Sequence, residues 1–135
     1  TTPLEAQPII CVDNEPDILD GMHALLSRWG ARPHVAASIA EAEEVLQRLM
    51  AEHGSLPRLL VVDYHLDEGE TGIEVIKSLR ELSGESLPAV VLTADRTDAV
   101  KDEVSAAGCS ILYKPVKPAA LRALVTSIIS KYRAA

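Results

Sequence analysis

The sequence has few aromatic residues and few cysteines. It contains no phenylalanine and only 3% aromatic residues, while 47% of its residues are hydrophobic, so its core must be mainly aliphatic. The two cysteines, Cys11 and Cys109, lie in or beside apolar runs. This placement is typical of small core side chains in a reducing compartment and argues against a disulfide framework. A thiolate metal site would require more ligands at closer spacing.

Long apolar runs and an excess of positive charge are also missing. No stretch approaches the ~18–20 apolar residues that span a membrane. The first residues lack the basic start and the apolar run of a secretory signal. The formal net charge of −7 disfavours direct binding to nucleic acid. We therefore expect neither membrane insertion by this segment nor contact with nucleic acid.

The length of 135 residues fits one domain, because a domain usually contains about 100–200 residues. Residues 1–8, which include Pro3 and Pro8, are expected to form a linker or tail. Residues 9–135 are expected to form the domain itself, and no repeat or low-complexity segment divides them.

Short apolar runs alternate along the chain with segments in which apolar residues recur at helical spacing. The runs are typical of buried strands in a parallel sheet. Strands that alternate with helices predict an α/β fold whose parallel strands are joined by right-handed crossovers. We expect a flavodoxin-like doubly wound sheet of five parallel strands in the order 2-1-3-4-5, with five helices. The predicted strands are 9–12, 33–36, 59–63, 89–92 and 110–113, and the predicted helices lie within 16–29, 38–50, 72–82, 98–107 and 121–132.

Four polar side chains stand where predicted strands end. The central run 59–62 leads into Asp63, and the first, fourth and fifth strands lead into Asp13, Thr93 and Lys114. Because the carboxyl ends of parallel strands share one edge of the sheet, where open α/β folds bind ligands, we expect these side chains to converge. Each has an ordinary alternative when taken alone, as a helix cap, a turn or a surface lysine. Their occurrence together at neighbouring strand ends favours a binding site.

The four side chains have the chemistry of a phosphate site. Two ionised carboxylates ~4 Å apart repel each other by about 4 kcal/mol at an effective dielectric constant of about 20. Asp13 and Asp63 therefore require a cation, and Mg²⁺ suits them because it prefers oxygen ligands. Lys114 would add a second positive charge, and the Thr93 hydroxyl would donate a hydrogen bond to a phosphoryl oxygen. Asp63 would then be the nucleophile that forms an acyl phosphate.

Over nearly its whole length the chain resembles a response-regulator receiver domain of two-component signalling systems. The motifs that carry the resemblance stand in order at strand ends. They are VDNEPDIL at 12–19, Val62-Asp63 followed by Thr71-Gly72, Thr93-Ala94, and Lys114-Pro115.

The resemblance implies that Asp63 accepts a phosphoryl group from the phosphohistidine of a histidine kinase or a histidine phosphotransfer domain. It implies that Thr93 and Lys114 hold the phosphoryl group and report its presence. It further implies a Mg²⁺ site formed by Asp13, Asp63 and the backbone carbonyl of His65. The Lys114–Pro115 peptide is expected to be cis, which is an accessible isomer only before proline.

The chain departs from the family pattern in three places. Asn14 stands where the family has a second acid, so it is a weaker candidate metal ligand and metal affinity should fall. Ile111 replaces the usual aromatic switch residue, and Tyr113 on the same strand face is a candidate substitute. The loop after Asp63 lacks the common proline and is one residue longer than in the simplest members.

Two further residues are candidates for tuning the lifetime of the phosphorylated state. His65 lies two residues after Asp63, and Asp95 lies two residues after Thr93. In the family such positions flank the path of the hydrolytic water, so we hypothesise that the two side chains approach each other over the site. The alternative is a pair of solvated side chains. The remaining histidines, His23, His34 and His53, form no metal-ligand pattern.

The resemblance leaves the context of the domain open. The segments 14–16, 63–66 and 71–72 are similar to receivers at the carboxyl end of hybrid sensor histidine kinases. This similarity implies a cytoplasmic location, free or tethered to a membrane sensor kinase. By itself such a domain would show at most weak self-phosphorylation and self-dephosphorylation. The family also uses the last two helices as a surface for homodimers or partners.

Three other functions fit parts of the sequence. A degenerate receiver that binds partners without phosphate is favoured by Asn14 and Ile111 and opposed by the intact Asp63, Thr93 and Lys114. An aspartate-nucleophile phosphatase would usually carry a second aspartate where His65 stands. Flavodoxin-like cofactor binding would require a loop rich in Ser, Thr or Gly after the first strand, and residues 14–17 have the wrong charge.

Overall fold

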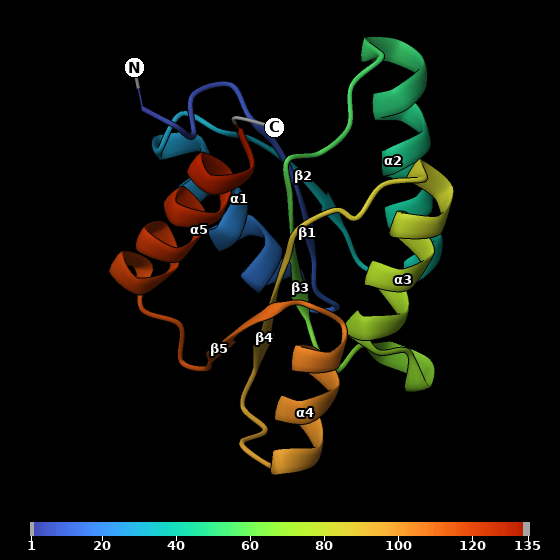
Figure 1. The fold of residues 1–135 in the computed structure, drawn as a ribbon, viewed down its shortest axis with the longest axis vertical. Helices are drawn as coiled ribbons and strands as arrows, with labels where there is room; N and C mark the ends of the chain where they lie inside the picture. The colour runs from blue at the N-terminus through green and yellow to red at the C-terminus, as the bar shows by residue number, and fades with distance from the viewer. Residues whose placement is uncertain (1, 134–135) are drawn as a thin grey trace.

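The computed structural model describes residues 2–133, and residues 1, 134 and 135 of the predicted tail and domain lie outside that range. It shows a parallel five-stranded sheet in the order β2-β1-β3-β4-β5 with helices on both faces (Figure 1). The predicted fold class and strand order are therefore confirmed. The strands are β1 Pro8–Val12, β2 Arg32–Ala36, β3 Leu59–Asp63, β4 Ala89–Thr93 and β5 Ser110–Tyr113. The helices are α1 Pro16–Arg28, α2 Ile39–His53, α3 Gly72–Ser83, α4 Asp98–Ala106 and α5 Pro118–Arg133, with a 3-10 turn at Asp67–Gly69.

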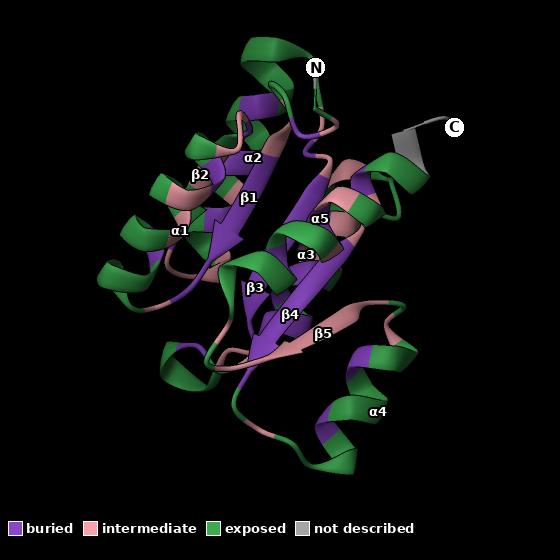
Figure 2. Ribbon diagram, turned by 90° about the vertical axis from the view of Figure 1, so that its left-hand side faces the viewer, coloured by how far each residue is buried: buried purple, intermediate pink, exposed green. Residues whose placement is uncertain are grey.

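The central strand β3 is buried on both faces of the sheet. All five of its residues are buried, and their side chains alternate between two apolar clusters. Leu60 and Val62 join the cluster covered by α2, α3 and α4, while Leu59 and Val61 join the cluster covered by α1 and α5. Figure 2 shows the central strands in the colour of buried residues, with exposed positions mainly on the helices. Full burial of such a side chain contributes about 1.5–3 kcal/mol, so β3 is a rigid support for Asp63 at its end.

The residues before β1 pack against the rest of the domain. Leu4 is only 2% exposed and belongs to the cluster beneath α1 and α5. The backbone is held as well, since the Ala6 N–H donates to the Gly30 carbonyl (2.7 Å) and the Arg32 N–H donates to the Gln7 carbonyl (2.8 Å). A single apolar residue such as Leu4 forms no periodic pattern, so the burial of this segment could not be predicted from the sequence.

Strand register aligns the ends that carry the candidate site. Val12 lies opposite Val62, so Asp13 and Asp63 follow neighbouring strands at the same level. Asp63 lies opposite Leu92, and Thr93 lies opposite Tyr113, which directly precedes Lys114. The carboxyl edge of the sheet therefore gathers the predicted residues. No helix in the described range has the length and apolar character needed to cross a membrane.

Candidate functional site

The structure brings Asp13, Asp63, Thr93 and Lys114 together at the carboxyl edge of the sheet. The Lys114 Nζ lies 2.5 Å from Asp63 Oδ1 and 3.8 Å from Asp13 Oδ2, so one ammonium stands between two carboxylates. Asp13 and Asp63 are 4% and 6% exposed. The Lys114 N–H donates to the Thr93 carbonyl (2.9 Å), and the peptide between Lys114 and Pro115 is cis. These contacts aim the lysine side chain at the end of β3.

Burial and charge act against each other in this cluster. Burial raises the pKa of the Asp13 carboxyl, and the negative charge of Asp63 adds to that rise; the Glu15 N–H and Lys114 offset only part of it. Burial lowers the pKa of Lys114, but its hydrogen bond to Asp63 and the charges of Asp63, Asp13 and Glu15 outweigh burial and leave it raised. Lys114 is therefore a fixed positive charge, whereas Asp13 is ionised at a cost.

One oxygen of Asp13 has no hydrogen-bond partner. Asp13 Oδ1 accepts the Glu15 N–H at 2.9 Å, but Oδ2 is buried and receives no hydrogen bond within the described chain. A buried carboxylate oxygen that accepts no hydrogen bond, next to a second carboxylate, suits a hard cation. Mg²⁺ typically takes one or two carboxylates and completes its shell with water and phosphate oxygens. No group of three or more His, Cys, Asp or Glu side chains with metal-binding geometry occurs in residues 2–133.

The Asn14 side chain, at the position where the family has a second acid, is hydrogen-bonded to another loop. Its Nδ2 donates to Asp67 Oδ1 at 2.8 Å, across the entrance to the site. Sequence reasoning missed Asp67, which lies four residues after Asp63 in the loop DEGE and could be noticed only as part of an acidic run. His65, whose carbonyl is the third predicted ligand, forms an isolated antiparallel bridge with Thr71. The bridge fixes the backbone of this loop beside the start of α3.

The loop after β4 is organised by side-chain hydrogen bonds. Thr93 Oγ1 accepts the Asp95 N–H (3.0 Å), and Asp95 Oδ1 accepts the Thr97 N–H (2.9 Å). The hydrogen bonds from Thr97 lower the pKa of Asp95, and the nearby His65 adds to this effect. His65 Nε2 lies 3.9 Å from Asp95 Oδ2, so the structure brings the two candidate lifetime residues together.

The two candidate switch residues on β5 have different surroundings. Ile111 is partly buried against the cluster under α2, α3 and α4. Tyr113 is partly exposed, and the Arg96 guanidinium lies over its ring, 4.4 Å from the ring centroid. Such a cation–π contact stabilises by about 0.5–1 kcal/mol at an exposed site. Because Arg96 lies three residues after Thr93, it links the loop after β4 to Tyr113, a link that sequence reasoning missed.

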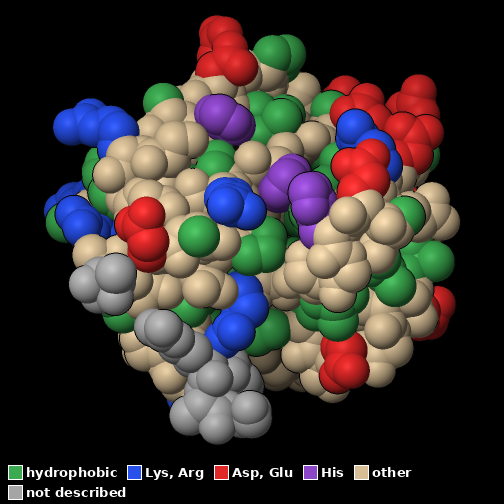
Figure 3. Space-filling view, turned by 90° about the horizontal axis from the view of Figure 1, so that it is seen from above, with side chains coloured by type: hydrophobic (Ala, Val, Ile, Leu, Met, Phe, Trp, Pro, Cys, Tyr) green, Lys and Arg blue, Asp and Glu red, His purple; other side chains and the backbone are tan. Residues whose placement is uncertain are grey.

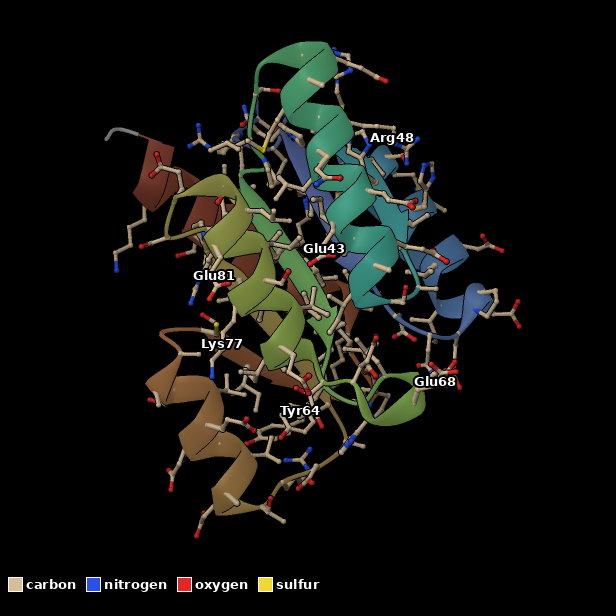
Figure 4. The ribbon with its side chains drawn as sticks, turned by 90° about the vertical axis from the view of Figure 1, so that its right-hand side faces the viewer. Glu43, Arg48, Tyr64, Glu68, Lys77 and Glu81 are labelled. Atoms are coloured by element: carbon tan, nitrogen blue, oxygen red, sulfur yellow. The ribbon has the colours of Figure 1, made fainter. Side chains whose placement is uncertain are left out.

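Tyr64 is a second residue that sequence reasoning missed. It directly follows Asp63, and its hydroxyl donates to the Glu103 carboxylate on α4. Its ring also meets the His65 ring edge-to-face with centroids 4.7 Å apart, and Figure 4 shows it directed toward α4. The hydrogen bond to Glu103, together with partial burial and nearby acids, raises the pKa of Tyr64 to about 12. Tyr64, the residue next to the candidate nucleophile Asp63, is thus hydrogen-bonded to α4.

We expect Tyr64→Phe to lower the local stability of α4 without displacing Asp63 and its neighbours. The change removes the hydroxyl that bonds Glu103 and keeps the ring, so the free energy of unfolding should fall by about 1 kcal/mol or less. Amide hydrogen exchange in α4 should become about fivefold faster. Tyr113→Phe is the matched control, because its ring contacts Arg96 without a hydroxyl bond in the described structure. Unchanged α4 exchange in Tyr64→Phe would contradict a coupling through this hydrogen bond.

An apolar groove adjoins Lys114. It has a volume of about 320 Å³ and lies between α1 and the segment that joins β5 to α5. Ile18, at its edge, is 38% exposed, which is unusual for a large apolar side chain of this protein. The apolar residues that line it are Ile18, Met22, Leu25, Leu92, Pro115, Val116, Pro118 and Leu121.

A doubly wound sheet with a buried aspartate pair, a threonine and a lysine at its carboxyl edge defines a phosphoacceptor module of the receiver type. The family model for the response regulator receiver domain matches residues 9–126, and the chain belongs to that family. Receiver domains are the phosphoacceptor modules of two-component signalling, and their phosphorylation generally depends on Mg²⁺.

Similar proteins agree with this assignment. The chain is 37% identical over 124 residues to the "uncharacterized 14.6 kDa protein in sodA1 3'region" of Leptolyngbya boryana, covering 90% of this chain and 89% of that protein. It is 33% identical over 110 residues to the two-component response regulator PhoP of Pseudomonas aeruginosa, covering 81% of this chain but only 47% of PhoP. The fold matches the chemotaxis response regulator CheY4 of Vibrio cholerae with a TM-score of 0.77 at 23% identity, covering 91% of this chain and 98% of CheY4.

Proposed function

We propose that Asp63 accepts a phosphoryl group from a phosphohistidine and that the phosphorylated domain binds its partners differently. The observation that carries this proposal is the Lys114 ammonium 2.5 Å from the Asp63 carboxylate, beside a buried oxygen of Asp13 that accepts no hydrogen bond. In the transfer, an Asp63 oxygen forms a bond to phosphorus while the bond from phosphorus to the histidine nitrogen breaks. The electron pair of the broken bond stays on the imidazole.

Each neighbour of Asp63 has a separate task. Asp13, Asp63 and the carbonyl of His65 would hold Mg²⁺, with Asn14 as a weaker candidate because its amide is bonded to Asp67. When bound, Mg²⁺ would neutralise part of the charge on the phosphoryl oxygens. Lys114 would move its ion pair from the Asp63 carboxylate to a phosphoryl oxygen, and the Thr93 hydroxyl would donate to another. Loss of the ion pair and movement of Thr93 would report the phosphorylated state to β5, where Ile111 and Tyr113 lie.

The phosphodonor would dock on the groove between α1 and the segment after β5. A histidine kinase or histidine phosphotransfer domain must bring its phosphohistidine to Asp63, so its surface must cover the rim of the site. The groove supplies exposed apolar area at that rim, with Lys114 in its wall. We place the domain in the cytoplasm, free or tethered to a membrane sensor kinase, with α4 and α5 as a surface for a homodimer or an output partner.

Phosphorylation by a small acyl phosphate tests the proposed function. The protein is incubated with acetyl phosphate and Mg²⁺, and intact mass is measured beside Asp63→Ala and beside a sample with Mg²⁺ chelated. We expect the wild type alone to gain one phosphoryl group, and the gain to require Mg²⁺. A gain on Asp63→Ala would place the acceptor elsewhere, and no gain on any sample would favour the phosphate-independent interaction module that Asn14 and Ile111 suggest.

We expect His65→Ala to lengthen the life of the phosphorylated state several-fold. His65 Nε2 faces Asp95 Oδ2 at 3.9 Å, so the pair can orient a water molecule toward the phosphoryl group. The measurement is the decay of phosphorylated protein after acetyl phosphate is removed. His53→Ala, which removes an exposed histidine on α2, is the control. Equal lifetimes for wild type and His65→Ala would show that the pair takes no part in hydrolysis.

A further inference from the structure

A large cavity lies at the opposite edge of the sheet from Asp63. Its volume is about 740 Å³. It opens to the surface and is lined by the starts of β1 and β2, the end of α2 and the loop before β3. Small-molecule sites in proteins are commonly about 300–1,000 Å³. Its residues are Ala6, Gln7, Pro8, Arg32, Pro33, His34, Leu49, His53, Ser55, Leu56 and Arg58.

The lining combines four potential cations with an apolar floor. Arg32, Arg58, His34 and His53 line the cavity, and no Asp or Glu does so within the described residues. This is notable in a chain whose formal net charge is −7. Figure 3 views the molecule from this end and shows histidine and basic side chains near the middle of the face, with acidic side chains mainly toward its rim.

The Arg58 guanidinium is incompletely paired. Its Nη2 is buried and has no hydrogen-bond partner in the part of the chain that the structure describes. Buried polar groups in native proteins are normally hydrogen-bonded, so Arg58, a residue of the cavity wall, keeps one buried N–H without an acceptor. A guanidinium is planar, and its paired N–H groups match the oxygens of a phosphate or a carboxylate.

The cations of this edge also repel one another. Burial lowers the pKa of His34, and the charges of His53, Arg48, His23 and Arg32 lower it further. Among these groups, within residues 2–133, His53 alone has an acidic partner: its Nε2 lies 4.0 Å from the Glu52 carboxylate on the exposed surface. A bound anion would relieve this repulsion, which gives the cavity an electrostatic preference for negative charge.

We propose that this cavity binds a small organic anion that bears a phosphate or a carboxylate group. Arg58 and Arg32 hold the anionic group, and His34 adds a hydrogen bond. The side chains of Pro8, Pro33, Leu49 and Leu56 receive the apolar body of the molecule. The site is built from the amino edge of the sheet and so is separate from the phosphoacceptor site at the carboxyl edge. Phosphorylation of Asp63 is not required for it to bind.

Nuclear magnetic resonance titration tests the proposal on the protein itself. Inorganic phosphate, citrate and adenosine monophosphate are added separately at constant ionic strength, with sodium chloride as the reference. We expect saturable amide shifts at Gln7, Arg32 and Arg58, and a pKa of His34 that rises when the anion is bound. Phosphate and adenosine monophosphate together, without citrate, would identify a phosphate ligand; the reverse would identify a carboxylate ligand.

Two variants make the test specific. Arg58→Gln should weaken binding at least tenfold, and Arg32→Gln provides an independent variant should the first change fail to fold. Arg28→Gln removes the same charge from an exposed site on α1 outside the cavity and should bind as the wild type does. The proposal is overturned if chloride produces the same shifts, if the shifts occur only around Asp63 and Lys114, or if Arg32→Gln binds with unchanged affinity.

Discussion

Gly72→Ala is expected to lower the free energy of unfolding by about 3 kcal/mol. Gly72 is the first residue of α3, and its N–H donates to the Tyr64 carbonyl at 2.8 Å. A Cβ at this position would lie 2.4 Å from the Asp63 carbonyl oxygen and 2.9 Å from Val62 Cγ1. The nearest atom belongs to the backbone of a fully buried strand, which cannot turn aside as a flexible side chain would. Either α3 or the end of β3 must shift.

The measurement for Gly72→Ala is urea unfolding, followed by the rate of phosphorylation with acetyl phosphate. The rate should fall as well, because the clash displaces the backbone that carries Asp63. Gly21→Ala is the matched control: Gly21 lies within α1, and a Cβ there would meet nothing within 4 Å. That change should stabilise the fold by about 0.5–1 kcal/mol. Equal stability of Gly72→Ala and wild type would mean that α3 does not rest on the Asp63 backbone.

The sequence predicted the parts of the site that depend on strand order. Once apolar runs such as 59–62 were recognised as parallel strands, the polar residue after each run had to lie at a common edge. This reasoning placed Asp13, Asp63, Thr93 and Lys114 together. In the structure the Lys114 ammonium lies within 4 Å of both carboxylates, and the Lys114 N–H bonds the Thr93 carbonyl. Strand ends are predictable because crossover connections keep the strands parallel, which puts every carboxyl end at the same edge of the sheet.

Contacts between side chains from different loops could not be predicted in this way. Asn14 bonds Asp67 across 53 positions, and Tyr64 bonds Glu103 across 39 positions. Neither pair is separated by a sequence distance that predicts contact, because both contacts depend on the backbone path of the loop that follows a strand. The docking of Leu4 was missed for a related reason, because one apolar residue carries no period.

Asp13→Asn is expected to stabilise the fold while it removes Mg²⁺-dependent phosphorylation. Asp13 is 4% exposed, and its Oδ2 has no hydrogen-bond partner in the described structure. Burial raises the pKa of this carboxyl above the ordinary value of 3.8, so the folded state holds the proton more tightly than the unfolded state does. The contribution of Asp13 to stability is therefore greatest below pH 3.8 and is lost as pH rises through the raised pKa.

This sign determines how the variant should behave. At neutral pH the ionised Asp13 opposes folding, so Asp13→Asn should be more stable than wild type by about 1 kcal/mol. The difference should shrink as pH falls through the raised pKa and should be smallest below pH 3.8, where Asp13 is protonated in both states. Urea unfolding at several pH values measures the difference. Asp20→Asn, which removes an exposed carboxylate on α1, should show no comparable gain.

The same substitution separates stability from function. Asparagine can still accept the Glu15 N–H, but it removes one of the two carboxylates available to Mg²⁺, so phosphorylation by acetyl phosphate should fall about 100-fold. Raising the Mg²⁺ concentration should recover part of the phosphorylation rate, because the substitution lowers the affinity of the site for Mg²⁺. If Asp13→Asn is less stable than wild type at neutral pH, the attraction between Lys114 and the Asp13 carboxylate exceeds the cost of burying that charge. A variant that is phosphorylated at the wild-type rate would show that Asp13 is not a metal ligand. A gain in stability together with a loss of phosphorylation would show that the carboxylate is kept for its chemistry, at the expense of the fold that holds it.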